Sequence, residues 1–135
     1  METNRVENAA YRHLHGHNCA QAVACAYCDM LGVDEQTMFQ LTSGLGSGIG
    51  GMEGTCGAIN GAAIVAGMKA QQLGYTKPEV YKVSSSVMKA FKEKNQSVTC
   101  KELKGIETGK ILRGCHDCVI DAAQILDETM KNLEK

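Results

Sequence analysis

The stretch from Gly44 to Gly61 constrains the fold of this 135-residue chain more than any other part of the sequence. Seven of its first fourteen residues are glycine, so the backbone there can adopt positive φ angles and pass close to whatever it surrounds. Ordering so many glycines has a high entropic cost, which indicates that the shape of the segment is needed. Cys56 follows, directly before a helical pattern of small apolar residues. Its sulfur is therefore expected at a helix N-terminus, where the dipole favours a thiolate.

The remaining sequence has helical periodicity. Apolar spacing, capping residues and glycine stops predict helices at residues 4–15, 19–31, 35–43, 57–73, 78–95 and 115–133, with a short turn at 100–104. No segment has the pattern of a strand, and strands and helices do not alternate. We predict an all-α fold, a single-domain bundle of five to six helices spanning residues 1–135. A glycine-rich loop should precede a central, buried helix of small residues.

Composition argues against several classes of partner. The net charge is −1, lysines and arginines are scattered, and aromatic residues make up only 4% of the chain, so nucleic-acid binding is not expected. The N-terminal residues lack the apolar core of a signal peptide, and no apolar run is long enough to span a membrane. We therefore expect a cytoplasmic protein without membrane insertion. No Ser-His-acid or paired-carboxylate spacing supports a hydrolase, and whether the chain is an enzyme stays open.

Seven cysteines are many for a cytoplasmic chain, and they favour metal binding or redox chemistry over static disulfides. Four of them, Cys19, Cys56, Cys100 and Cys115, each fall at the predicted start of a different helix. If these helix starts converge, free backbone N–H groups and positive dipole ends would surround a set of thiolates. Such a setting suits a thiolate-ligated metal or a reactive dithiol.

The other cysteines form two C-x-x-C spacings with different expectations. Cys25 and Cys28 lie among apolar residues inside a predicted helix, so core packing is the favoured interpretation. Cys118 follows Cys115 by three residues at the start of the last helix, as in redox dithiols. The roles of these three additional cysteines stay open at this point.

Histidines accompany two of the four helix starts. His13, His15 and His17 alternate just before Cys19 and could join a metal site, because imidazole and thiolate both suit zinc or iron. A solvated, histidine-rich turn is the favoured interpretation. His116 is interpreted as a helix-surface residue.

The chain resembles the C-GCAxxG-C-C family of redox-active proteins over most of its length. The resemblance rests on these motifs: Asn18-Cys19-Ala20-Gln21-Ala22-Val23, Cys56-Gly57-Ala58-Ile59-Asn60-Gly61 after the glycine run, Cys100 before Glu102-Leu103, and Cys115 before the last helix. It implies a small helical domain whose four named cysteines form one redox site. Related domains in split-Soret-type cytochromes imply a [2Fe-2S] cluster bound by those four positions. Covalent haem is not expected, because the sequence has no Cys-x-x-Cys-His.

Three functional hypotheses follow. The first is an electron-transfer protein in which the four cysteines bind an iron-sulfur cluster and serve an unknown redox partner protein. The second is a metal-free thiol-disulfide protein, with Cys56 as nucleophile and Cys115 or Cys118 as resolving thiol. The third is a structural zinc module with four cysteine ligands. The small-residue helix could also mediate a homodimer.

Overall fold

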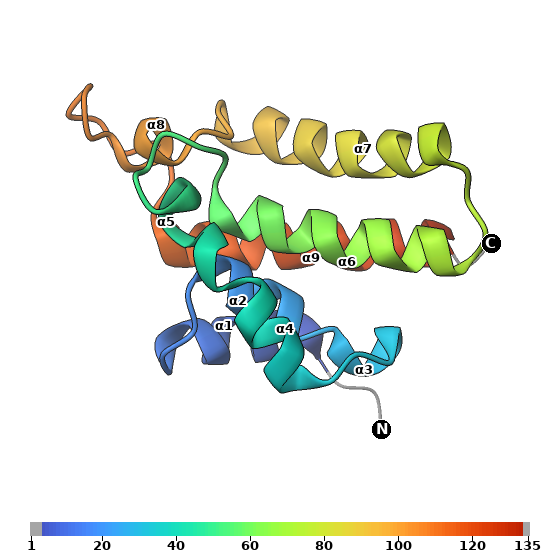
Figure 1. Cartoon of the computed structure of the whole chain (residues 1–135). Coiled ribbons are helices and arrows are strands. Elements are labelled where there is room, and N and C mark those ends of the chain that lie inside the picture. Colours follow the sequence, from blue (N-terminus) through green and yellow to red (C-terminus); the bar gives the residue numbers. More distant parts are fainter. Residues whose placement is uncertain (1–3, 134–135) are drawn as a thin grey trace.

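The computed structural model describes residues 4–133, and this part of the chain is built from helices without a strand (Figure 1). The elements are α1 (Arg5–Leu14), α2 (Cys19–Cys25), α3 (Cys28–Leu31), α4 (Glu35–Leu41), the 3-10 helix η1 (Ser43–Leu45), α5 (Gly46–Ile49), α6 (Gly57–Gln72), α7 (Lys77–Asn95), α8 (Cys100–Lys104) and α9 (Cys115–Leu133). The predicted all-α class is confirmed. The predicted single domain also includes residues 1–3 and 134–135, which lie outside the described part.

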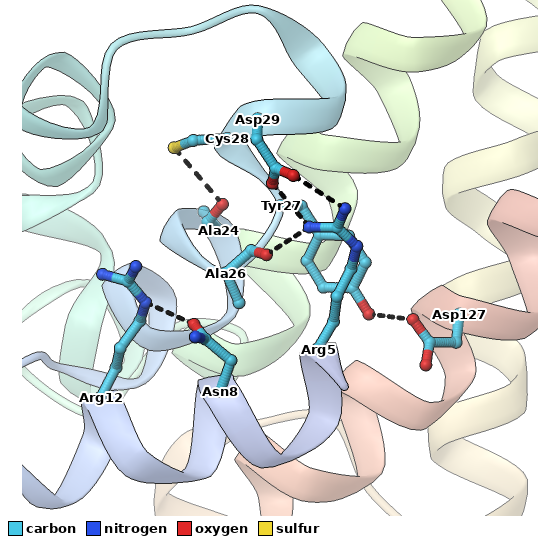
Figure 2. A network of polar contacts seen from close by, with 9 residues as sticks. All are labelled: Arg5, Asn8, Arg12, Ala24, Ala26, Tyr27, Cys28, Asp29 and Asp127. Atoms are coloured by element: carbon cyan, nitrogen blue, oxygen red, sulfur yellow. Dashed lines mark hydrogen bonds and ion pairs between the residues drawn. The ribbon is translucent and has the colours of Figure 1, made fainter. Parts of the chain in front are cut away.

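The predicted number of five to six helices is not confirmed, partly because the helix expected over 19–31 is broken. Tyr27 leaves the helical conformation, with φ −117° and ψ 5°, and separates α2 from α3. Arg5 of α1 donates a hydrogen bond of 2.8 Å to the Ala26 carbonyl and pairs with Asp29, while the Tyr27 hydroxyl donates to Asp127 of α9 (Figure 2). The hydrogen bond from Arg5 thus supplies a partner to the Ala26 carbonyl at the end of α2.

The predicted glycine-rich loop is likewise not confirmed, because only residues 50–56 of the segment lack a helix. The segment coils into η1 and α5 before it reaches Cys56. Within α5 the backbone takes the left-handed conformation at Ser47 (φ 50°) and Gly48 (φ 56°), and Gly50 follows at φ 82°. Ile49, between Gly48 and Gly50, also has positive φ (60°), so residues 47–50 form a continuous left-handed stretch in which glycine occupies two of the four positions.

Helix α6 packs against α2, α7 and α9 (Figure 1). Its small residues allow this close approach. A Cβ atom at Gly61 would lie only 2.5 Å from the Ala20 carbonyl oxygen of α2. Large buried side chains fill the core, including Tyr27 between α2 and α3, Met38, Phe91 and Leu126. Among the described helices, none is both long enough and apolar enough to cross a membrane.

Candidate metal and redox centre

Four helix starts from distant parts of the sequence meet at one end of the molecule. Cys19, Cys100 and Cys115 are the first residues of α2, α8 and α9, and Cys56 is the N-cap of α6. The four predicted cysteines line a single cavity of about 10 Å³ together with Cys118. In Figure 1, the start of α6 lies beside α5 and α8. The structure thus brings all four predicted positions together and adds a fifth thiol.

Backbone hydrogen bonds tie the start of α6 to the start of α8. The amide of Cys56 donates to the carbonyl of Val98 at 2.7 Å, and the amide of Cys100 donates to the carbonyl of Gly54 at 3.0 Å. The end of the glycine-rich segment therefore runs directly alongside the residues before α8. This pairing fixes Cys56 and Cys100 next to each other although they are far apart in sequence.

Two glycines leave space for the cysteine side chains. A Cβ atom at Gly48 would lie 2.5 Å from the Cys100 Cβ, and the φ of Gly48, +56°, is itself unfavourable for other residues. A Cβ atom at Gly57 would lie 3.2 Å from the Cys19 Cβ and 2.9 Å from the Leu45 carbonyl oxygen. These positions form a cradle that larger residues would fill.

The sulfurs of Cys19 and Cys115 lie 2.9 Å apart in the cavity. This is longer than a disulfide bond of about 2.05 Å. It is also shorter than the separation of about 3.8 Å expected for two thiolates on one tetrahedral ion. All seven cysteines, which lie within residues 4–133, are free thiols. The two sulfurs are therefore within hydrogen-bond distance and not joined by a disulfide.

Surroundings distinguish the two members of this pair. The hydrogen bond from Cys19 lowers the pKa of Cys115 to about 5, with further help from the charges of His13 and Lys104 and against the effect of burial. The same hydrogen bond and burial raise the pKa of Cys19. Cys115 is thus the thiolate and Cys19 the donor.

The pKa of Cys56 is lowered as well. The neighbouring Cys118 thiol lowers it, together with the backbone amides of Ala58 and Ile59 at the start of α6, against burial. The pKa of Cys118 is raised by the neighbouring Cys56 and by burial, and its thiol donates to the Arg113 carbonyl at 3.8 Å. Burial raises the pKa of Cys100. The prediction that a helix N-terminus favours the Cys56 thiolate is consistent with these directions.

Positive side chains also line the cavity. Lys104 and Arg113 are both part of its wall. The Arg113 guanidinium donates hydrogen bonds of 2.9 and 3.2 Å to the carboxylate of Asp121, which is 1% exposed. This contact holds Arg113 beside the thiols, where its charge offsets part of the charge of the thiolates.

A family model described as "Putative redox-active protein (C_GCAxxG_C_C)" matches residues 17–129. The chain belongs to this family. The predicted resemblance is therefore confirmed, and all four named cysteines lie within the matched range. No curated protein and no solved structure gives a match.

In this member of the C-GCAxxG-C-C family, Cys118 lines the cavity and His13 lies close to Cys19 and Cys115. Cys118 lies about one helical turn after Cys115 in α9, so the two side chains share a helix face. Their spacing of three residues, typical of redox dithiols, is visible in the sequence. His13 of α1 lies 3.7 Å from the Cys115 sulfur, measured from its Nε2. The solvated-turn interpretation fits the exposed His15 but not the half-buried His13. No local sequence signal connects His13 with a cysteine about a hundred residues later.

Two cysteines remain apart from the centre. Cys25 and Cys28 are buried in the core near the ion pair of Arg12 and Glu35, consistent with the packing role predicted for them. Burial, followed by the neighbouring Cys28, raises the pKa of Cys25 to about 12. Both residues are therefore protonated at neutral pH and unsuited to act as thiolates.

Proposed function

We propose that this chain is an electron-transfer protein in which Cys19, Cys56, Cys100 and Cys115 bind an iron-sulfur cluster of the [2Fe-2S] type. The observation that carries the proposal is the convergence of these four thiols on one cavity. Four cysteine thiolates are the ligand set of such clusters. When bound, the cluster would supply a one-electron redox couple. An unidentified redox partner protein would exchange that electron.

The chain's own residues fit this ligand role. Gly48 and Gly57 leave room for the cysteine side chains, so the backbone can surround a bound group closely. The charges of Lys104 and Arg113 would compensate the negative charge that four thiolates bring. Cys19, Cys56 and Cys100 are each at most 6% exposed, so the chain shields them from water. Hydrogen bonds to sulfur and positive neighbours both favour the reduced state, which would raise the reduction potential.

The proposal is tested by iron and acid-labile sulfide analysis with a visible spectrum on protein purified without oxygen. We expect iron, sulfide and charge-transfer bands in the wild type and their loss in Cys56→Ser. Cys25→Ser is the matched control, because Cys25 is buried away from the cavity, and it should keep the bands. Colourless, iron-free wild-type protein would overturn the proposal, and tightly held zinc in its place would support the zinc module.

One observation favours a second candidate, a metal-free dithiol, namely the 2.9 Å between the sulfurs of Cys19 and Cys115. The Cys115 thiolate would attack a disulfide of a partner protein and release the first partner thiolate. Cys19 would then lose its proton, attack the Cys115 sulfur and release the second partner thiolate. The Cys19–Cys115 disulfide forms and the partner disulfide is reduced by two electrons. The one proton that Cys19 loses passes to one partner thiolate, and the other partner sulfur leaves as a thiolate that exchanges protons with solvent.

The same chemistry is available to Cys56 and Cys118, which both line the cavity and have pKa values shifted in opposite directions. Thiol counting distinguishes the dithiol from the cluster. A dithiol protein loses two thiols for each pair on oxidation by a disulfide reagent and stays colourless before and after. Loss of thiols accompanied by release of iron would instead support the cluster.

A further inference from the structure

His13, Cys19 and Cys115 form a compact group of three metal-ligand side chains from α1, α2 and α9. Their ligand atoms all lie within 4.8 Å of one another. His13 precedes the range that the family model matches, which begins at residue 17. The histidine therefore lies outside the part of the chain that the family model describes.

The orientation of His13 leaves one ring nitrogen directed at the thiols. Its Nε2 lies 3.7 Å from the Cys115 sulfur, and its Nδ1 lies 2.9 Å from the Nδ1 of His116. The two rings are stacked with their centroids 5.1 Å apart. When the His13 Nδ1 donates its proton to His116, the Nε2 lone pair faces the sulfurs. Metal-binding histidines are held in this way, with the second ring nitrogen bonded to an outer partner.

We propose that His13, Cys19 and Cys115 bind a single thiophilic divalent cation, of the Zn²⁺ or Fe²⁺ type, in the reduced chain that carries no cluster. Imidazole and thiolate together are a ligand set that such ions favour. The three ligand atoms, all within 4.8 Å of one another, are close enough to reach one ion. The three side chains leave a fourth tetrahedral position to a solvent molecule.

Binding changes the site in a defined way. Cys19 and Cys115 both become thiolates, and the remaining proton of the pair is released to solvent. The two sulfurs move from 2.9 Å apart to about 3.8 Å, the spacing set by metal-sulfur distances of about 2.3 Å. A disulfide between the two cysteines would remove both thiolates, so oxidation should abolish binding.

The experiment is a titration of the full-length, reduced, iron-free chain with Co²⁺, a coloured substitute for zinc. We expect one Co²⁺ per chain, with the absorption bands of a tetrahedral thiolate site. His13→Ala should lose these bands. His116→Ala should weaken binding about 10- to 100-fold, as expected for loss of an outer partner. His15→Ala is the matched control, because His15 is exposed and bonded to the Tyr11 carbonyl, and it should bind as the wild type does.

Two results would overturn the inference: a reduced wild type that binds no Co²⁺, or a His13→Ala variant that binds it unchanged. X-ray absorption of the cobalt-loaded wild type makes the test independent of how the variant folds. One nitrogen ligand at about 2.0–2.1 Å with two sulfurs at about 2.3 Å supports the proposal. A shell of four sulfurs contradicts it.

Failure of this inference can be separated from failure of the proposed function. The cluster requires Cys100, whereas the single-ion site does not. Cys100→Ser should therefore lose iron and sulfide and still bind Co²⁺, while His13→Ala should keep iron and sulfide after anaerobic purification. If Cys100→Ser and His13→Ala instead lose both properties together while circular dichroism reports wild-type helix content, the two sites are not distinct and the inference fails.

Discussion

Cys19 and Cys115 carry the same functional group, yet their surroundings give the two thiols opposite protonation preferences. The hydrogen bond between the two sulfurs lowers the pKa of Cys115 and raises that of Cys19, which favours Cys19 as the donor and Cys115 as the thiolate. His13 and Lys104 add positive potential at that sulfur. The reactive thiolate of the metal-free protein is therefore set by a few neighbours and not by the identity of the residue.

This assignment predicts how Cys115 reacts as pH changes. Because its pKa is lowered to about 5, Cys115 should stay a thiolate above that pH and lose reactivity only as the pH falls through 5. In reduced, metal-free protein, iodoacetamide labelling of the Cys115 peptide should show a midpoint near that value. Cys19→Ala removes the donor and should raise the midpoint. A wild-type midpoint near 8.5, the ordinary cysteine value, would contradict the assignment.

Gly48 has an equally local role, because its lack of a side chain makes room for Cys100. Gly48→Ala would place a Cβ atom 2.5 Å from the Cys100 Cβ, so we expect it to displace that thiol and lower iron content. Gly50→Ala is the control, since Gly50 also has positive φ (+82°) but no atom within 4 Å of its Cβ position. Both changes should reduce stability by about 1–2 kcal/mol through backbone strain. Equal iron content in the two variants would contradict the role of Gly48.

Between helices, close packing decides how a glycine-to-alanine substitution changes stability. Alanine normally stabilises a helix interior by about 1 kcal/mol relative to glycine. At Gly61 of α6 we predict the reverse, because the new Cβ would lie 2.5 Å from the Ala20 carbonyl oxygen and would force α2 away. Gly61→Ala should lower the free energy of unfolding by about 1–2 kcal/mol, as overpacking does. Urea denaturation measures this change.

The same helix offers the control. A Cβ atom at Gly67 would lie 3.7 Å from the nearest side-chain atom, on Val80, which is an ordinary contact. Gly67→Ala should therefore raise the free energy of unfolding by roughly 0.5–1 kcal/mol. If both substitutions stabilise the protein, the close approach of α6 to α2 is not a constraint on this fold.

Local signals account for the elements that the sequence predicted correctly. Asn18 caps α2, which begins at Cys19. The change from glycine-rich residues to small apolar residues at Cys56 marks the start of α6. Both signals lie within a few positions of the sequence. The break at Tyr27 depends on Arg5 in another helix, so periodicity alone could not reveal it. The approach of His13 to the cavity has the same origin, because it follows from the packing of α1 against α9.

Across the whole molecule, the buried carboxylate of Asp121 links α9 to the end of α7 and to Arg113, which lines the cysteine cavity. Asp121 of α9 contacts Arg113 before that helix and both Lys94 and Asn95 at the end of α7. Burial alone would raise its pKa, but Arg113, Lys94 and Asn95 outweigh burial and hold the pKa below its ordinary value. The ionised form of Asp121 therefore stabilises the fold.

The lowered pKa of Asp121 predicts that the stability difference between the wild type and Asp121→Asn depends on pH. An aspartate has a pKa of about 3.9 when unfolded, so its contribution is fully present above that pH and is lost as the pH falls through the lower folded value. Asp121→Asn should lower the free energy of unfolding by about 2–3 kcal/mol at pH 7, with a smaller difference at pH 3. Asp117→Asn is the control, because Asp117 is exposed and 4.0 Å from Arg113. It should change stability by less than about 0.5 kcal/mol.

A potentiometric titration of the anaerobically purified wild type shows whether the four distant cysteines act as one redox centre. We expect visible bands that bleach reversibly with one electron per chain, at about 59 mV per tenfold change in the ratio of oxidised to reduced protein. A colourless protein that takes up two electrons for each cysteine pair, at about 30 mV per tenfold change, would contradict the cluster.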